Sequence, residues 1–122
     1  MRRGFEKVSG YEYVNFPKRK TKQSAGYDIE SAVNVVINPG ETKLIQTGIK
    51  AYMDENEWLG IYIRSSLAIK YGLVLANSVA VIDSDYYNNP ENEAEIIMAL
   101  IKKSGSPFAI KVRDRITEGG IN

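Results

Sequence analysis

Apolar and polar residues alternate in short segments along most of the chain. Val33, Val35 and Ile37 occupy every second position, and the segment 58–64 has the same period. A period of two is typical of a β-strand with one buried face. Further strand-like segments lie at 42–53, interrupted by Gly48, and at 73–76, 79–82 and 108–112. Turn residues such as Asn-Pro-Gly-Glu at 38–41 separate them, so the pattern predicts an all-β sandwich or barrel of short strands with little helix.

The segment 90–103 does not follow this pattern. Helix-forming residues and acids at 90–95 precede an apolar run at 96–101, and Lys102 and Lys103 follow it. Early acids and late lysines suit a helix dipole, so propensity favours a helix. A continuous apolar run of this length fits a strand buried on both faces equally well, and periodicity does not distinguish the two.

Composition indicates one globular domain covering 1–122. The 122 residues are 43% apolar and 25% charged, which is typical of a folded domain with a single core. The net charge of +1 gives no general attraction to nucleic acid or to an anionic membrane. No apolar run is long enough to cross a bilayer, and no apolar stretch follows the N-terminal charges. We therefore expect a cytoplasmic protein with neither a nucleic-acid nor a membrane partner.

The sequence contains no cysteine and no histidine. The first absence excludes disulfides, thiolate zinc sites and cysteine nucleophiles. The second excludes the Ser-His-Asp triad, imidazole metal ligands and the usual proton shuttle near neutral pH. An enzyme of this composition would depend on carboxylates, hydroxyls, amides, cationic side chains and a hard metal ion.

Four short clusters are candidates for chemistry. The first, 24–28, reads Ser-Ala-Gly-Tyr-Asp and on its own resembles a tight turn in which Asp28 bonds backbone amides. The second, Arg64-Ser65-Ser66, follows an apolar strand and could cradle an anion. The residues alone favour a simpler interpretation of it, a helix-capping serine beside a surface arginine.

The third cluster, 82–87, reads Ile-Asp-Ser-Asp-Tyr-Tyr and begins like a calcium loop. Tyr87 and Asn88 stand where that loop requires an oxygen ligand and a glycine, so we reject a calcium site. What remains is a turn capped by Asp83. The fourth cluster, 113–115, reads Arg-Asp-Arg and is typical of a charged turn. The basic run 18–22 has no interleaved aromatic residues and is interpreted as a solvated loop.

The order of the four clusters resembles the trimeric dUTPases, the dUTP diphosphatases of nucleotide metabolism. The resemblance runs from about Ser24 to Ile116 and includes the connecting segments 38–44 and 47–49. Four motifs in order are far more specific than any one of them. The resemblance implies a jelly-roll-like β-barrel of the β-clip class, and a homotrimer with active sites at the subunit interfaces. It also implies that 95–102 is a strand.

The resemblance further implies hydrolysis of dUTP to dUMP and pyrophosphate. Asp83 matches the carboxylate that activates the water attacking the α-phosphorus, with Mg²⁺ on the triphosphate oxygens. Asp28 would lie near metal-bound water. Phosphate-binding residues of the second and fourth motifs correspond to Arg64, Ser65, Ser66 and Arg115.

Uracil recognition is implied for the main chain of a hairpin. This segment runs from Asn77 through Val79 to Val81, and cytosine would leave its buried polar groups unpaired. Tyr86 matches the tyrosine that packs under the sugar and leaves no space for a ribose 2′-hydroxyl.

Several residues depart from the family pattern. Ala80 and Arg113 each replace a usual glycine, and a positive φ at Ala80 would cost about 1 kcal/mol. Glu118 would bring negative charge toward the phosphates. The segment 87–89, Tyr-Asn-Asn, replaces a usual basic or polar residue, glycine and acid. The sequence ends at Asn122 without the glycine-rich fifth motif that closes over the phosphates, and Gly119-Gly120 does not substitute for it, so we expect this tail to be absent.

Two alternatives stay open at this stage. The dCTP deaminases share the fold and an Arg-Ser-Ser-Leu-Ala stretch, but they rely on a glutamate at the base, whereas 83–86 matches the diphosphatases. The altered fourth motif and the absent tail also allow a catalytically weak nucleotide-binding or regulatory interaction protein.

Overall fold

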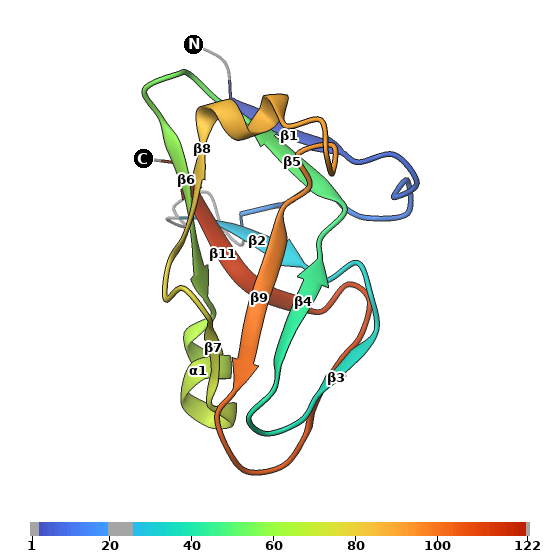
Figure 1. Ribbon diagram of the computed structural model, residues 1–122, viewed down its shortest axis with the longest axis vertical. Helices are drawn as coiled ribbons and strands as arrows, with labels where there is room; N and C mark the ends of the chain where they lie inside the picture. Colours follow the sequence, from blue (N-terminus) through green and yellow to red (C-terminus); the bar gives the residue numbers. More distant parts are fainter. Residues whose placement is uncertain (1–2, 20–25, 122) are drawn as a thin grey trace.

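The computed structural model describes residues 3–19 and 26–121 and is built mainly of short antiparallel strands (Figure 1). No helix in these two ranges is long and apolar enough to cross a membrane. The elements, in chain order, are β1 Gly4–Lys7, β2 Tyr27–Glu30, β3 Val35–Ile37, β4 Thr42–Gln46, β5 Ile49–Tyr52, β6 Trp58–Ile63, α1 Ser65–Tyr71, β7 Leu73–Leu75, β8 Ala80–Asp83, the 3-10 helix η1 Ser84–Asn88, β9 Ile97–Lys102, β10 Phe108–Ile110 and β11 Arg115–Ile121.

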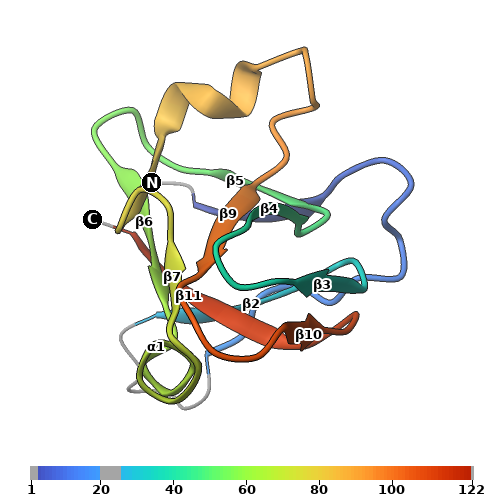
Figure 2. The ribbon, with the colours of Figure 1, turned by 60° about the horizontal axis from the view of Figure 1, so that its bottom comes forward.

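The strands form four small antiparallel sheets around one core. The largest has the order β2-β11-β6-β8, and the second has the order β4-β9-β7. The other two sheets are the two-stranded pairs β1-β5 and β3-β10. Within the described residues, the prediction of short strands with little helix is confirmed. In both Figure 1 and Figure 2, α1 and η1 lie at opposite ends of the molecule.

The core receives one residue in two from most strands. Leu59 and Ile61 of β6 are at most 1% exposed, while Tyr62 on the opposite face is 43% exposed. Gly48 ends the strand that precedes it: its φ is +70°, and a Cβ there would lie 2.7 Å from the Tyr11 ring. The predicted interruption of 42–53 at this glycine is therefore confirmed.

The segment 97–102 is a strand, as the family resemblance implied and against its helix propensity. β9 is the central strand of its sheet, between β4 and β7. Met98 and Leu100 are buried on one face, and the residues between them are half-buried. Burial on both faces explains the continuous apolar run, because tertiary packing overrides local propensity. The helix-forming residues before it, 91–94, form turns.

Candidate functional site

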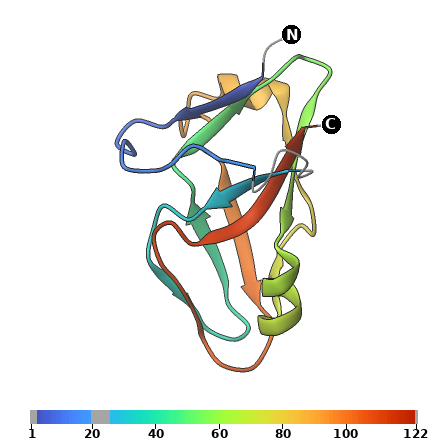
Figure 3. The ribbon, with the colours of Figure 1, turned by 180° about the vertical axis from the view of Figure 1, so that it is seen from behind.

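Strand β11 brings three of the four candidate clusters together. It pairs with β2, which carries Asp28, and with β6, which ends one residue before Arg64. Figure 3, seen from behind, shows β11 alongside β2. Arg115 Nη1 lies 3.3 Å from Asp28 Oδ2, and Arg64 Nη1 donates to the carbonyl oxygen of Arg115 at 3.3 Å. The Arg64 amide also donates to Ile116 O at 3.1 Å. The first, second and fourth clusters thus form one group.

The ion pair between Arg115 and Asp28 orients side chains more than it stabilises the fold. The Arg115 side chain is 47% exposed, while Asp28 as a residue is 9% exposed. A pair open to solvent on one side contributes at most about 1 kcal/mol. Its arrangement does hold a carboxylate and a guanidinium at one edge of the sheet, ready for an anionic ligand or a hydrated cation.

A cleft of about 240 Å³ lies over this group. Its lining residues are Asn15, Phe16, Lys18, Arg19, Asp28, Glu30 and Arg115. Sequence analysis assigned Lys18 and Arg19 to a solvated loop. Both are exposed, but they also add positive charge to the cleft, and the Arg19 guanidinium lies 5.4 Å from the centre of the Tyr27 ring. The run of basic residues just before the first cluster was the feature of the sequence that could have indicated their place in the cleft. The other residues of that run, and Ser24 and Ala25 of the first cluster, lie outside the described residues.

The second cluster begins the short helix α1. Arg64 is the residue before the helix, and its carbonyl oxygen accepts the amides of Leu67 and Ala68. Ser65 and Ser66 open the helix with both residues exposed. Arg64 is half-buried and bonded to the fourth cluster, so it is not the unattached surface arginine that the residues alone favoured.

The third cluster lies on β8 and η1, away from the other three. Asp83 is exposed at the junction of these elements, in register with Trp58 of β6. Tyr86 is half-buried; its hydroxyl donates to Glu95 O at 2.7 Å and accepts from Asn92 Nδ2 at 3.0 Å. Val81 is 54% exposed on the outer face of the sheet.

The segment 76–79 differs from the expected hairpin. β7 pairs with β9 and β8 pairs with β6, so Asn77 and Val79 lie in a turn between two sheets. Ser78 has the left-handed φ of this turn, +62°, and Val79 N donates to Asn77 O at 2.6 Å. Ala80 begins β8 with no positive φ, so the condition for a cost at this position is not met. β8 is an edge strand; among the described residues, its outer backbone groups face no further strand.

The single chain keeps Asp83 apart from the Asp28 group. β11 and β6 lie between β2 and β8, so the two carboxylates are three strand spacings apart, or about 14 Å across the sheet. Asp28 pairs with Glu118, and Glu118 pairs with Tyr62, whereas Asp83 pairs with Trp58 further along β6. The candidate residues therefore form two groups at opposite edges of one sheet.

The structure explains two of the departures in the fourth cluster region. Arg113 has a φ of +76°, a left-handed conformation that a glycine adopts without strain. Its amide donates to Ser31 O at 2.8 Å, which fixes the turn before β11. Glu118 is exposed and in register with Asp28, so it places negative charge beside the first cluster.

The structure also accounts for the departure from the family pattern at 87–89. The resemblance implied a glycine and an acid soon after Tyr86, where the chain has 88–89. The structure has a left-handed residue followed by a buried acid at Ala94 and Glu95 instead. Ala94 has a φ of +58°, and Glu95 Oε2 accepts from Gly48 N at 3.0 Å. The intervening residues form a longer connection between η1 and β9.

Metal-binding chemistry is limited to single carboxylates. Within 3–19 and 26–121, no three Asp or Glu residues lie close enough together to hold an ion. A hard cation here would need most of its oxygen ligands from a bound ligand and from water, because the carboxylates that line the cleft are Asp28 and Glu30.

Comparison with known proteins gives consistent similarities. The family model for dUTPase matches residues 12–118. A deoxyuridine 5′-triphosphate nucleotidohydrolase of Lactococcus lactis subsp. lactis is 51% identical over 119 residues, which are 96% of this chain and 79% of that protein. A protein of the same name from Nautilia profundicola is 39% identical over 105 residues, 86% of this chain and 70% of that protein.

Solved structures agree on the fold. The crystal structure of dUTPase from Streptococcus mutans superposes with a TM-score of 0.92 at 41% identity, covering 98% of this chain and 94% of that one. This similarity confirms the dUTPase-like β-barrel that the sequence predicted. A mutant dUTPase of Staphylococcus aureus phage phi11, whose structure reveals how a structural Mg(II) ion is coordinated, has a TM-score of 0.84 at 20% identity and covers 100% of this chain and 90% of that one.

Proposed function

This chain belongs to the dUTPase family, the dUTP nucleotidohydrolases, and we propose on that premise that it hydrolyses dUTP to dUMP and pyrophosphate. The observation that supports this most directly is the position of β11 between β2 and β6. That pairing gathers Asp28, Arg64 and Arg115, which come from three separate parts of the chain, beside a cleft that Asp28 and Arg115 line together with Lys18 and Arg19. Such a group suits a polyphosphate.

Asp83 is the proposed base. Its carboxylate is exposed at the end of a strand, where it can orient a water molecule in line with the α-phosphorus and accept its proton. We place Mg²⁺, the metal that the family uses, on the triphosphate oxygens, where it would neutralise charge. A single carboxylate, Asp28, fits such an ion through a bound water. Positioning and charge neutralisation provide most of the catalysis of phosphoryl transfer.

The cationic residues are assigned to the phosphates. Arg64 and Arg115 would donate to phosphate oxygens, and the hydroxyls of Ser65 and Ser66 would add neutral donors beside them. These contacts strengthen as charge develops on the leaving pyrophosphate. Glu118, next to Asp28, opposes them with a negative charge.

Base and sugar are assigned to the other group. The open edge of β8 and the turn from Asn77 offer main-chain donors and acceptors to uracil, including those of Val79 and Val81. Cytosine inverts the pattern at position 4, so it would leave buried groups unpaired. Tyr86 provides a ring of fixed position under the sugar, because both hydrogen bonds of its hydroxyl are already made within the chain.

A homotrimer is the proposed assembly. Since the two groups lie at opposite edges of one sheet, a cyclic arrangement in which one edge meets the other edge of the next chain would complete an active site at each interface. The outer face between the groups supports this arrangement, because Tyr62 and Val81 are 43% and 54% exposed there. The cytoplasmic location stays a prediction.

The test is pyrophosphate release from dUTP in the presence of Mg²⁺, compared with dTTP, dCTP and UTP. We expect turnover of dUTP with strong preference over the other three. Ammonia release from dCTP would instead identify a deaminase. No selective dUTP turnover, even after a glycine-rich tail is appended to the chain, would leave a nucleotide-binding or interaction protein.

A further inference from the structure

The far end of the Tyr86 side chain is attached to the turn 92–95. Its hydroxyl donates to Glu95 O at 2.7 Å and accepts from Asn92 Nδ2 at 3.0 Å. The near end is fixed by η1, which follows β8 directly. The orientation of the ring therefore depends on where this turn lies relative to β8.

The turn has an unfavourable backbone. Glu93 and Ala94 are consecutive and have φ values of +56° and +58°. A left-handed conformation is unfavourable for a residue with a side chain, because its Cβ comes too close to the following carbonyl oxygen. Local bonds help: Ala94 N donates to Asn92 Oδ1 and Glu95 N donates to Asn92 O, both at 3.1 Å. Two such residues in succession persist only where surrounding structure holds them.

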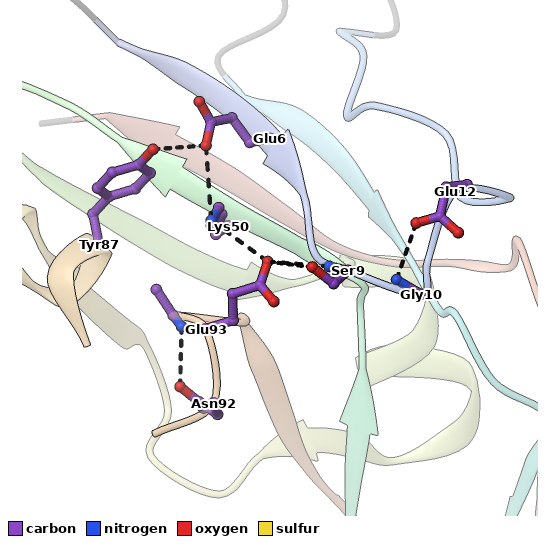
Figure 4. A network of polar contacts seen from close by, with 9 residues as sticks. Glu6, Ser9, Gly10, Glu12, Lys50, Tyr87, Asn92 and Glu93 are labelled. Atoms are coloured by element: carbon purple, nitrogen blue, oxygen red, sulfur yellow. Dashed lines mark hydrogen bonds and ion pairs between the residues drawn. The ribbon is translucent and has the colours of Figure 1, made fainter. Parts of the chain in front are cut away.

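The Glu93 carboxylate provides that attachment to the rest of the molecule (Figure 4). Its Oε2 accepts from both the amide and the hydroxyl of Ser9 at 3.1 Å, and it lies 3.6 Å from Lys50 Nζ. The Ser9 hydroxyl, then the Ser9 amide, lowers the pKa of the Glu93 carboxyl, and the Lys50 charge adds to this. The carboxylate is thus charged at neutral pH and bound to the N-terminal segment.

The same cluster also holds the neighbouring tyrosine. Lys50 Nζ lies 3.9 Å from Glu6 Oε1, and Glu6 Oε1 accepts from the Tyr87 hydroxyl at 2.7 Å (Figure 4). Lys50 also lies 5.3 Å from the centre of the Tyr87 ring. Residues 6–9 and β5 therefore hold the connection that contains Tyr86 in two places, at Tyr87 near its start and at Glu93 near its end.

We propose that Glu93 is a positioning residue that sets discrimination between deoxyribose and ribose nucleotides, because its contacts with Ser9 and Lys50 fix the turn against which the Tyr86 ring is held. The inference rests on the proposed function, in which this ring excludes the 2′-hydroxyl. A steric test of one oxygen atom requires a ring that does not move, since displacement by about 1 Å can change rates 100-fold.

The experiment compares kcat/KM for dUTP and UTP in the wild type and in Glu93→Ala. We expect the dUTP:UTP ratio to fall by about tenfold or more in the variant, because a loosened ring admits the ribose. Glu93→Gln, which keeps an oxygen for Ser9 but no charge for Lys50, should give an intermediate ratio. Glu91→Ala is the matched control: this exposed acid lies two residues away and outside the cluster, and the ratio should not change.

Overall activity alone does not decide the matter, because a merely structural role would lower both rates by one factor and leave the ratio intact. An unchanged ratio in Glu93→Ala therefore overturns the inference. Calorimetric binding of dUMP and UMP gives a second reading that should show the same loss of preference.

If Glu93→Ala does not fold, Ser9→Ala removes a single donor and should lower the ratio less. A wild type that shows no dUTP turnover refutes the proposed function and this inference with it, whereas a selective wild type with an equally selective variant refutes the inference alone.

Discussion

At the scale of single residues, Arg113 combines a strained backbone with useful contacts. Its φ is +76°, and its Nη2 donates to Tyr13 O at 3.3 Å. Glycine would remove about 1–2 kcal/mol of strain but would add about 0.5–1 kcal/mol of freedom to the unfolded chain. We expect Arg113→Gly to raise the free energy of unfolding by up to about 1 kcal/mol, measured by urea unfolding. Arg113→Ala loses the same hydrogen bond and keeps the strain, so a variant no less stable than Arg113→Gly would contradict this account.

The left-handed residues also mark the limit of prediction at this scale. The family pattern raised a positive φ only as a condition at Ala80, whereas the left-handed residues with side chains are Ser78, Glu93, Ala94 and Arg113. A non-glycine residue in this conformation leaves no local mark in the sequence, because the path of the turn imposes it. The contact that holds Glu93 is equally invisible, since Ser9 lies 84 residues away in the chain.

At the scale of elements, Glu95 ties the start of β9 to the chain before β5. It is 7% exposed, and burial, the largest cause, raises the pKa of its carboxyl above 4.5 despite the hydrogen bond from Gly48, with the Glu93 charge raising it further. As the pH rises above 4.5, the folded chain therefore keeps a proton on Glu95 that the unfolded chain has released. The stability from this group is complete below pH 4.5 and is lost as the pH rises through the folded pKa.

Glu95→Gln should therefore change how stability depends on pH. The amide keeps an oxygen for the Gly48 N–H and does not ionise. We expect the variant to gain stability relative to the wild type as the pH rises above 4.5, measured as the difference between their free energies of unfolding in urea. The exposed neighbour gives the comparison: Glu91→Gln should show a difference that does not vary with pH. A constant difference in Glu95→Gln would mean that the carboxyl ionises freely when folded.

Strands with a clear period of two could be predicted, and those without it could not. β6 places Leu59 and Ile61 in the core and exposes Tyr62, and it was found within one residue of its end. β11 was missed, because Gly119 and Gly120 argue against a strand. The structure requires the first of these: a Cβ on Gly119 would lie 3.1 Å from Ile29 Cδ1 and 3.2 Å from Leu59 Cδ1. Gly119 therefore has two effects: it lets β11 pack against the core, and it makes this strand hard to predict from the sequence.

At the scale of the whole molecule, the proposed division of the site between two edges would make activity depend on assembly. We expect Asp83→Asn and Arg64→Ala each to be inactive alone. Mixed one to one and refolded together, they should recover about a quarter of wild-type activity, because about one interface in four then combines an intact Asp83 with an intact Arg64. Asp83→Asn mixed with Tyr86→Ala is the control; both changes lie in the same group, so no interface is restored. A monomer by light scattering, or no recovery in the first mixture, would contradict the shared site.

The order of the motifs was predictable, but their division between two edges was not. The four clusters occur in the expected order along the chain, and three of them meet around β11. Nothing in that order indicates which strands become neighbours, because β2, β6 and β11 pair across long stretches of chain. The cleft residues Lys18 and Arg19 were missed for the same reason, since only the fold places them beside Arg115.

The open edge of β8 has a further consequence, for solubility. Backbone groups that are free to bind a base are equally free to pair with a strand from another molecule, and exposed edges of this kind nucleate aggregation. β8 limits the hazard by its length of four residues and by Asp83 at its end. The edge still cannot be closed by a further strand without closing the proposed base site. A nucleotide bound at this edge should therefore also protect the protein from aggregation.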